Sequence, residues 1–92
     1  MNPNHRIEIP EGVLVRELQG ESVLLNLDSE SYFGLDEVGT RMWNALATTP
    51  TTDAACEALL AEYDVAPERL RLDLDGFIAE LVTAGLVRVA PV

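Results

Sequence analysis

The stretch LLNLDSESYFGLDEVGTRMWNAL, residues 24–46, contains two strand-like runs and then a helix that carries the only tryptophan, Trp43. The two runs flank a short polar segment, residues 28–31, of the kind that reverses the chain. Asp36 follows the second run and is a suitable N-cap, because its carboxylate can accept hydrogen bonds from the free amides of a first helical turn. The stretch therefore predicts a β-hairpin that leads directly into a helix.

A further strand is predicted on the N-terminal side of this hairpin. Residues 13–18, VLVREL, are separated from the run at 22–27 by QGE, in which Gly20 can supply the positive φ of a short turn. Together with residues 31–35 these runs should form an antiparallel meander. Residues 1–12 contain two prolines and a glycine, and we expect them to be a flexible or extended arm.

The remainder of the chain has the periodicity of three helices. The first should begin after Asp36, the second near Thr52 or Asp53, and the third should run from Pro67 to a C-cap at Gly85. Their predicted inner faces are apolar: Val38, Met42, Ala45 and Leu46; Ala55, Cys56, Leu59, Leu60 and Tyr63; Leu70, Leu74, Phe77, Ile78 and Leu81. The expected fold is α+β, a single winged helix-turn-helix-like domain over residues 13–90, with a three-stranded antiparallel sheet followed by three helices.

The composition argues against nucleic acid and membranes as partners. The 92 residues include sixteen Asp and Glu but only six Lys and Arg, all of them arginine, for a formal net charge of −10. A protein that grips nucleic acid needs a clustered basic surface, whereas these arginines are spread among carboxylates. The sequence shows neither the roughly 18 apolar residues of a membrane span nor a secretion signal. We therefore expect a cytoplasmic protein, and the single cysteine, which cannot form an internal disulfide, agrees with a reducing compartment.

Catalytic and metal-binding chemistry has few candidate residues. The only histidine, His5, falls in the predicted arm and the only cysteine, Cys56, on a core-facing stripe, so a Cys–His pair is not expected. Zinc normally takes four ligands drawn from Cys and His, and the chain has only two such residues. A carboxylate pair such as Asp73 and Asp75 is not expected to hold a cation either, because residues two apart on a helix do not face each other. The sequence has no glycine-rich phosphate loop. We therefore expect neither an enzyme nor a bound metal or cofactor.

The third predicted helix carries a second stripe, turned away from its inner face, that consists of Leu72, Asp75, Gly76 and Ala79. Glycine inside a helix costs about 1 kcal/mol relative to alanine, so Gly76 suggests that something approaches the helix closely. The alternative is that Leu72 is an ordinary exposed leucine and Gly76 a tolerated weak point. The sequence leaves both interpretations open.

With no catalytic candidates, a surface that binds is the remaining kind of site. An unpaired edge strand offers a row of N–H and C=O groups that an extended peptide can complete, while its side chains enter pockets on a neighbouring helix. In the predicted sheet, residues 31–35 would be that edge.

The quoted stretch resembles the PqqD-like RiPP recognition element. Members of that family typically show a YFGL- or YYGL-type strand, a polar cap, and a helix with Gly and Trp at the positions of Gly39 and Trp43. The ending DGFIAELVTAGLV is similar to the family's closing helix with its terminal Gly-Leu pair. The resemblance covers residues 13–88, and a free-standing short domain of this kind looks most like the leader-peptide-binding proteins of lasso peptide biosynthesis.

The resemblance implies a non-catalytic adaptor. Such proteins bind the leader of a ribosomally made precursor peptide as an added β-strand between the third strand and the third helix. The resemblance implies two further partners. One is a separate leader peptidase, which is a transglutaminase-like cysteine protease, and the other is a cyclase. The resemblance and the helical spacing together suggest a peptide-binding site formed by Ser31, Tyr32, Phe33, Gly34, Leu35, Leu70, Arg71, Leu74, Asp75 and Ile78.

Two other functions stay open at the level of sequence. One is a PqqD-type peptide chaperone in another peptide-derived cofactor or natural-product pathway. The other is a winged-helix transcription regulator or a plain dimerising module, because three strands and three helices also outline a DNA-binding fold.

Overall fold

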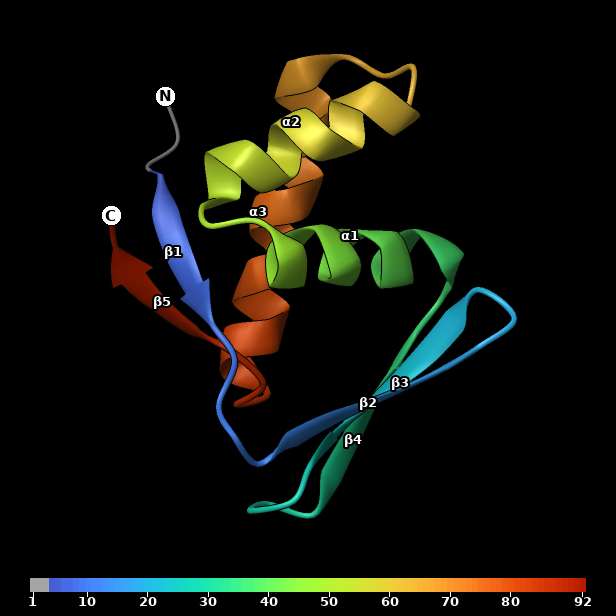
Figure 1. Cartoon of the computed structure of the whole chain (residues 1–92), viewed down its shortest axis with the longest axis vertical. Helices are drawn as coiled ribbons and strands as arrows, with labels where there is room; N and C mark the ends of the chain where they lie inside the picture. Colours follow the sequence, from blue (N-terminus) through green and yellow to red (C-terminus); the bar gives the residue numbers. More distant parts are fainter. Residues whose placement is uncertain (1–3) are drawn as a thin grey trace.

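The computed structural model describes residues 4–92 and arranges them as two small sheets and three helices (Figure 1). In chain order the elements are β1 (His5–Glu8), β2 (Val13–Leu18), β3 (Glu21–Asn26), β4 (Ser31–Leu35), α1 (Glu37–Thr48), α2 (Thr52–Glu62), α3 (Pro67–Thr83) and β5 (Arg88–Pro91).

The predicted meander is present as an antiparallel sheet in the order β2-β3-β4. Gln19 and Gly20 connect the paired residues Leu18 and Glu21 as a two-residue turn, and their φ angles are 55° and 83°. Two consecutive positive φ angles are typical of the type I′ turns that match the twist of a hairpin. Gly20 therefore has the role expected of it. Gln19 carries a side chain in the same left-handed region.

The first two helices begin at side-chain caps. The Asp36 carboxylate accepts a hydrogen bond from the Gly39 amide at 2.8 Å, as the sequence predicts for α1. The Thr51 hydroxyl accepts one from the Ala54 amide at 3.1 Å and caps α2. These bonds satisfy amides that the helices themselves leave without an acceptor.

The third helix begins and ends where the sequence predicts. Pro67 stands at its first position, where a missing N–H costs nothing. Gly85 follows its end with a φ of 74°, and the amides of Gly85 and Leu86 donate to the carbonyls of Val82 and Leu81 at 3.0 and 2.9 Å. This pair of bonds is a Schellman motif, which a glycine at this position allows. No helix among residues 4–92 is both long and apolar enough to cross a membrane.

A single core lies between the helices and the inner face of the three-stranded sheet. Its best-buried large side chains, at most 1% exposed, are Leu24, Leu59, Leu74, Leu81 and Leu86. The predicted inner faces of the helices supply most of the core. Val38 is an exception at 49% exposure, because the buried face of α1 begins only at Thr40.

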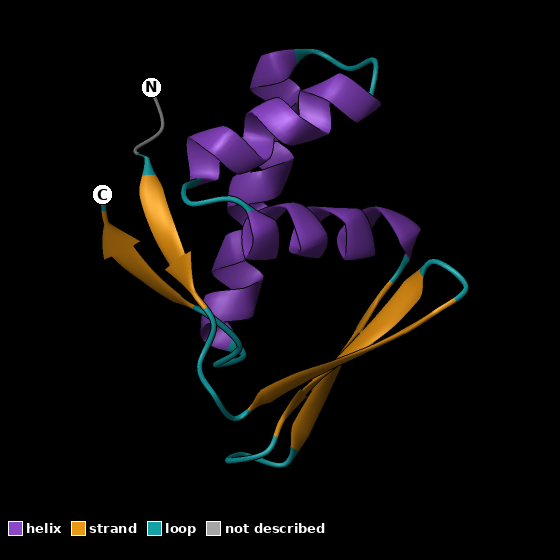
Figure 2. Ribbon diagram, viewed as in Figure 1, coloured by secondary structure: helices purple, strands orange, loops and turns teal. Residues whose placement is uncertain are grey.

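His5–Glu8 form a strand within the segment that the sequence predicts to be a flexible or extended arm. This strand, β1, pairs antiparallel with β5, from His5 opposite Pro91 to Glu8 opposite Arg88. Figure 2 shows the pair as a separate two-stranded sheet beside the helices. The sequence signal is weak because the strand has only four residues and its single large apolar side chain, Ile7, packs on the core. Residues 1–3 of the predicted arm lie outside the described residues.

Candidate peptide-binding site

The outer edge of β4 is open to strand addition. In the three-stranded sheet β4 pairs with β3 alone, and the C-terminal strand β5 pairs with β1 instead. Alternate residues of Ser31–Leu35 therefore direct backbone N–H and C=O groups away from β3, where no strand of the described chain meets them. The strands β1, β2 and β5 also have an open edge, so an edge alone does not locate a site.

The side chains of β4 alternate between the two faces of the sheet. Leu35 is buried and Phe33 is half-buried against the core, whereas Tyr32 is 77% exposed on the other face. Gly34 shares the outer face with Tyr32, and a β-carbon added to Gly34 would meet no atom within 4 Å. The outer face of the sheet is therefore uncovered beside Gly34.

Phe33 also forms one wall of a groove whose other wall is the C-terminal half of α3. The groove has a volume of about 450 Å³ and is lined by Phe33, Ala79, Glu80, Thr83 and Ala84. We call it the Phe33 groove. Its lining is mostly apolar, with Glu80 as the single ionisable side chain. An open strand edge thus lies next to a hollow that can receive apolar side chains.

Other hollows lack this combination of β4 and α3. One of about 590 Å³ on the outer face of the sheet includes Leu18, Val23 and Gly34 but no residue of α3. Another of about 550 Å³ is more polar and lies between α1, α2 and the first hairpin, with Glu37 and Arg41 in its lining. Only the Phe33 groove, among the hollows described for residues 4–92, joins the edge strand to the helix that the resemblance implicates.

Three of the helix residues suggested for the site lie in the core. Leu70, Leu74 and Ile78 are 5%, 0% and 8% exposed and belong to the cluster that packs α3 onto the rest of the domain. Their side chains hold the helix in place beside the sheet. A charge introduced at Leu74 would therefore disrupt folding before it tested peptide binding.

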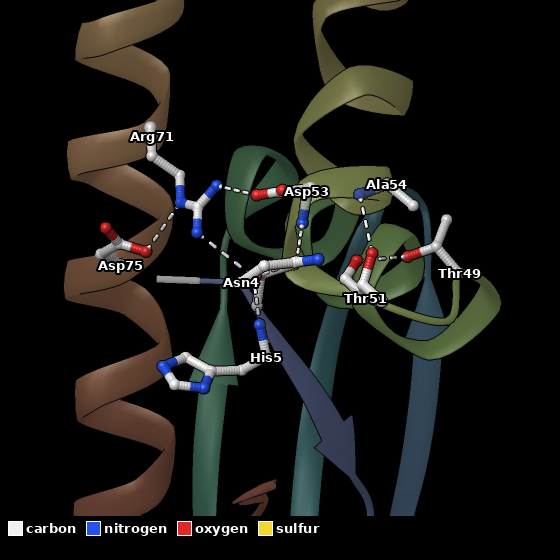
Figure 3. Close-up of polar contacts among 9 residues, drawn as sticks. Asn4, His5, Thr49, Thr51, Asp53, Ala54, Arg71 and Asp75 are labelled. Atoms are coloured by element: carbon white, nitrogen blue, oxygen red, sulfur yellow. Dashed lines mark hydrogen bonds and ion pairs between the residues drawn. The ribbon is translucent and has the colours of Figure 1, made fainter. Parts of the chain in front are cut away.

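The other two, Arg71 and Asp75, lie on the side of α3 that faces the start of α2 (Figure 3). The Arg71 guanidinium donates to Asp75 at 3.1 Å, to Asp53 at 2.6 Å and to the Thr52 hydroxyl at 3.2 Å. Burial alone would lower the pKa of Arg71, but the hydrogen bonds to Asp53 and Asp75 outweigh it and raise the pKa above its ordinary value. These contacts join α3 to α2.

The N-terminal segment enters the same cluster. The Asn4 side-chain oxygen accepts hydrogen bonds from the Asp53 amide at 2.9 Å and from the Thr52 hydroxyl at 3.1 Å. The His5 amide donates to the Thr52 hydroxyl oxygen at 3.0 Å. Asn4 therefore acts as a second cap on α2 and fixes the beginning of β1 to the helices (Figure 3).

Four groove residues were not assigned to the site by sequence reasoning: Ala79, Glu80 and Thr83 on α3, and Ala84 at its C-cap. The second stripe on the helix was the available signal, because Gly76 and Ala79 precede Thr83 by seven and four residues and so share its face. Gly76 is exposed, and a β-carbon there would meet no atom within 4 Å. Space is therefore free directly beside Gly76.

Cys56 is buried on α2, away from the groove lining. Burial raises the pKa of its thiol, although the nearby Arg71 charge acts in the opposite direction. A neutral, buried thiol is a poor nucleophile. Within residues 4–92, no group of three His, Cys, Asp or Glu side chains is placed to hold a metal ion.

Comparisons with known proteins extend these observations. The family model for coenzyme PQQ synthesis protein D (PqqD) matches residues 21–87. A solved structure described as "TbiB1 in Complex with the TbiA(beta) Leader Peptide" is 33% identical, has a TM-score of 0.83, and covers 88% of this chain and 94% of that one. A second, "Lasso peptide synthetase B1 complexed with the leader peptide", is 18% identical with a TM-score of 0.79, covers 90% and 98% of the two chains, and supports the fold alone. No curated protein sequence matched the chain.

The matched family model spans both blocks of sequence that carry the resemblance, the strand-to-helix stretch and the closing helix. The first solved structure reproduces the arrangement of strands and helices over nearly the whole of both chains. This chain therefore belongs to the PqqD family, and its fold is that of a PqqD-like RiPP recognition element.

Proposed function

We propose that this protein is a non-catalytic adaptor that binds the leader segment of a ribosomally synthesised precursor peptide, of the lasso class. The leader would add to the sheet as a strand along β4, next to α3. The observation that carries this proposal is the open edge of β4 beside the Phe33 groove. The complexes of TbiB1 and of lasso peptide synthetase B1 with leader peptides support it, the former at 33% identity.

The ten residues suggested from the sequence would have three kinds of role. Ser31–Leu35 would supply the backbone groups that pair with the leader, and Gly34 would present no side chain that hinders its approach. Leu70, Leu74 and Ile78 would support α3 from the core. Arg71 and Asp75 would position α3 through their contacts with α2. Contact with leader side chains would come instead from the residues that line the Phe33 groove.

Backbone pairing alone would give weak binding. Each strand hydrogen bond contributes only about 0.5–1.5 kcal/mol net, and ordering a flexible leader costs several kcal/mol, about 2–5. Burial of one large apolar leader side chain adds about 2–3 kcal/mol at about 25 cal/mol per Å². The Phe33 groove would therefore decide the affinity and the strand edge the orientation.

An N-methyl scan of the leader tests strand addition. The probe is a synthetic leader of the precursor encoded beside this gene, methylated at one backbone nitrogen at a time and titrated by calorimetry. If the leader pairs with β4, methylation at alternate positions removes a hydrogen bond and weakens binding, while the positions between them tolerate it. Loss of affinity without a period of two, or no binding of the unmodified leader, would count against the proposal.

A matched pair of variants tests the groove. Ala79 and Ala61 are both exposed alanines on helices, but only Ala79 lines the Phe33 groove. Ala79→Trp should fill the groove and weaken leader binding at least about tenfold, because about 1.4 kcal/mol of burial is lost. Ala61→Trp should leave the affinity unchanged. Equal affinities for the two variants would place the leader elsewhere.

The adaptor would deliver its bound precursor to other proteins. Following the family, we propose the leader peptidase, a transglutaminase-like cysteine protease, and the cyclase as these partners, all acting in the cytoplasm where the precursor is translated. Addition of the adaptor should raise the rate at which the purified peptidase cleaves its precursor. A precursor with the N-methyl substitution that most weakens binding should lose this acceleration.

The other candidate with a specific observation in its favour is a PqqD-type chaperone with a different client. The match to the PqqD family model supports it, and the physics of binding would be the same. Titration of the protein with a lasso precursor leader and with the precursor peptide of another pathway separates the two candidates, because each predicts tighter binding of its own client. DNA binding has less support, because Arg69 and Arg71 on α3 are paired with carboxylates, Asp73 for the former and Asp53 and Asp75 for the latter.

A further inference from the structure

Glu80 gives the Phe33 groove an uncompensated negative charge. It is the one ionisable residue in the groove lining. Its side chain is exposed, and its carboxylate has no hydrogen bond or ion pair with any residue from 4 to 92. A guest peptide in the groove therefore meets one free carboxylate among apolar atoms.

Two other carboxylates of α3 are neutralised by arginines one helical turn away. Arg69 contacts Asp73 at 3.3 Å and Arg71 contacts Asp75 at 3.1 Å, both at the i,i+4 spacing. Glu80 has Gly76 four residues before it and Ala84 four residues after it. The helix thus supplies no cation that could pair with Glu80.

The position of Glu80 is also unfavourable for the helix itself. It lies in the last turn of α3, where the partial negative charge of the helix C-terminus disfavours a carboxylate. A glutamine or a lysine would suit this position better. A side chain that the fold does not favour, placed in a groove, points to a role in binding.

We infer that Glu80 makes the groove select guest peptides with a Lys or Arg two residues from the large apolar side chain that enters the groove. Side chains two apart in an extended peptide lie on the same face, about 6.6 Å from each other. Glu80 and Ala84 are one turn apart on α3, about 6 Å along the helix axis. A peptide that runs along α3 can therefore bury its apolar side chain near Ala84 and bring the cation to Glu80. The inference rests on the proposed function, because it assumes an extended guest in this groove.

Selection from a random peptide library tests the inference without knowledge of the natural leader. The probe is a library of linear 12-residue peptides, displayed as mRNA fusions and selected on the immobilised full chain. Wild type should enrich peptides with Lys or Arg two residues from an aromatic or leucine side chain. Glu80→Gln should lose the basic preference and keep the apolar one, and Glu80→Lys should select Asp or Glu at the same position. Glu68→Gln, at an exposed glutamate near the other end of α3, is the matched control and should select as wild type does.

Affinities of one selected peptide give the size of the effect. Replacement of its basic residue by glutamine should weaken binding to wild type by about 2- to 5-fold at low salt, the range of an exposed ion pair. The same replacement should change binding to Glu80→Gln by less than about 1.5-fold, so the two substitutions are coupled. Equal losses with both proteins would overturn the inference.

The outcomes separate this inference from the proposed function. Enrichment of the apolar feature alone, or a basic preference that persists in Glu80→Gln, would show that Glu80 does not select the guest, while the groove would still bind peptides. Failure of any peptide to be enriched would overturn both. Glu80→Gln should melt about 1–5 °C higher than wild type, as expected when a carboxylate is removed from a helix C-terminus. A lower melting temperature would mean that the carboxylate serves the fold, and would also overturn the inference.

Discussion

At the scale of single residues, the sequence predicts a position well when a neighbour along the chain sets its role. Asp36 and Gly85 act as a cap and as a helix end because each bonds with amides or carbonyls only a few residues away. Which side chains face the groove depends instead on how segments far apart in the sequence pack together. Helical spacing correctly puts Leu70, Leu74 and Ile78 on the inner face of the third helix, which the core covers, but it does not show which residues of that helix border the edge of β4.

Gly76 offers the sharpest test at this scale. Gly76→Ala should raise the melting temperature by about 4–8 °C, because alanine in a helix is about 1 kcal/mol more favourable and the space beside Gly76 is open. Differential scanning calorimetry measures the shift. Gly39→Ala in α1 is the matched control, since its β-carbon would lie 3.3 Å from the Leu35 side chain, so little or no gain is expected there. A destabilised Gly76→Ala would mean that α3 needs glycine for its shape.

The buried position of Cys56 predicts that its thiol is alkylated slowly. Because burial raises the pKa of its thiol, little thiolate forms in the folded state, and alkylation by iodoacetamide at pH 8 should require the domain to open. The labelling rate should therefore rise with urea in parallel with unfolding measured by circular dichroism. The leader should slow labelling in proportion to its occupancy. Rapid labelling of the native protein would contradict the buried position.

At the scale of elements, the strands and helices with strong periodicity are predicted from the sequence, and the short paired termini are not. β1 and β5 have four residues each and stand at opposite ends of the chain. The sequence around each strand therefore gives no sign of the strand with which it pairs. Their pairing depends on where α2 and α3 bring the chain. The Phe33 groove is missed for a similar reason, since it is formed by residues of β4 and of the end of α3 that are far apart in the sequence.

Removal of β1 tests what this pair of strands contributes. Deletion of residues 1–8 should lower the free energy of unfolding by about 2–4 kcal/mol, since it removes a helix cap and the packing of Ile7. Urea unfolding followed by circular dichroism measures the change. Asn4→Ala alone should cost about 1 kcal/mol. If the deletion leaves stability unchanged, residues 5–8 behave as the flexible arm that the sequence suggests.

At the scale of the whole molecule, the excess of carboxylates affects how partners arrive. The formal charge of −10 produces a field that attracts cationic ligands over distances comparable with the Debye length, about 10 Å at 0.1 M salt. This property can be read from the composition alone. The place where the field acts on a guest depends on which arginines are already paired, and that requires the structure.

Association kinetics test this steering. The rate constant for binding a leader that carries Lys or Arg should fall about tenfold between 20 mM and 500 mM salt, roughly the size expected for a steered encounter, while the dissociation rate changes less. Stopped-flow fluorescence measures both rates. A leader with its basic residues replaced by glutamine is the control and should show little dependence on salt. Equal salt dependence for the two leaders would assign the acidic surface to solubility alone.

The pairing of β1 with β5 brings the two ends of the described chain next to each other, with His5 opposite Pro91 (Figure 1). A circularly permuted protein should therefore fold, with the ends joined by a few glycines and new ends opened in the loop between α1 and α2. The same adjacency means that this domain can be inserted whole into a surface loop of another protein. Fusion through the paired strands β1 and β5 would leave the edge of β4 free to bind a peptide in the new host.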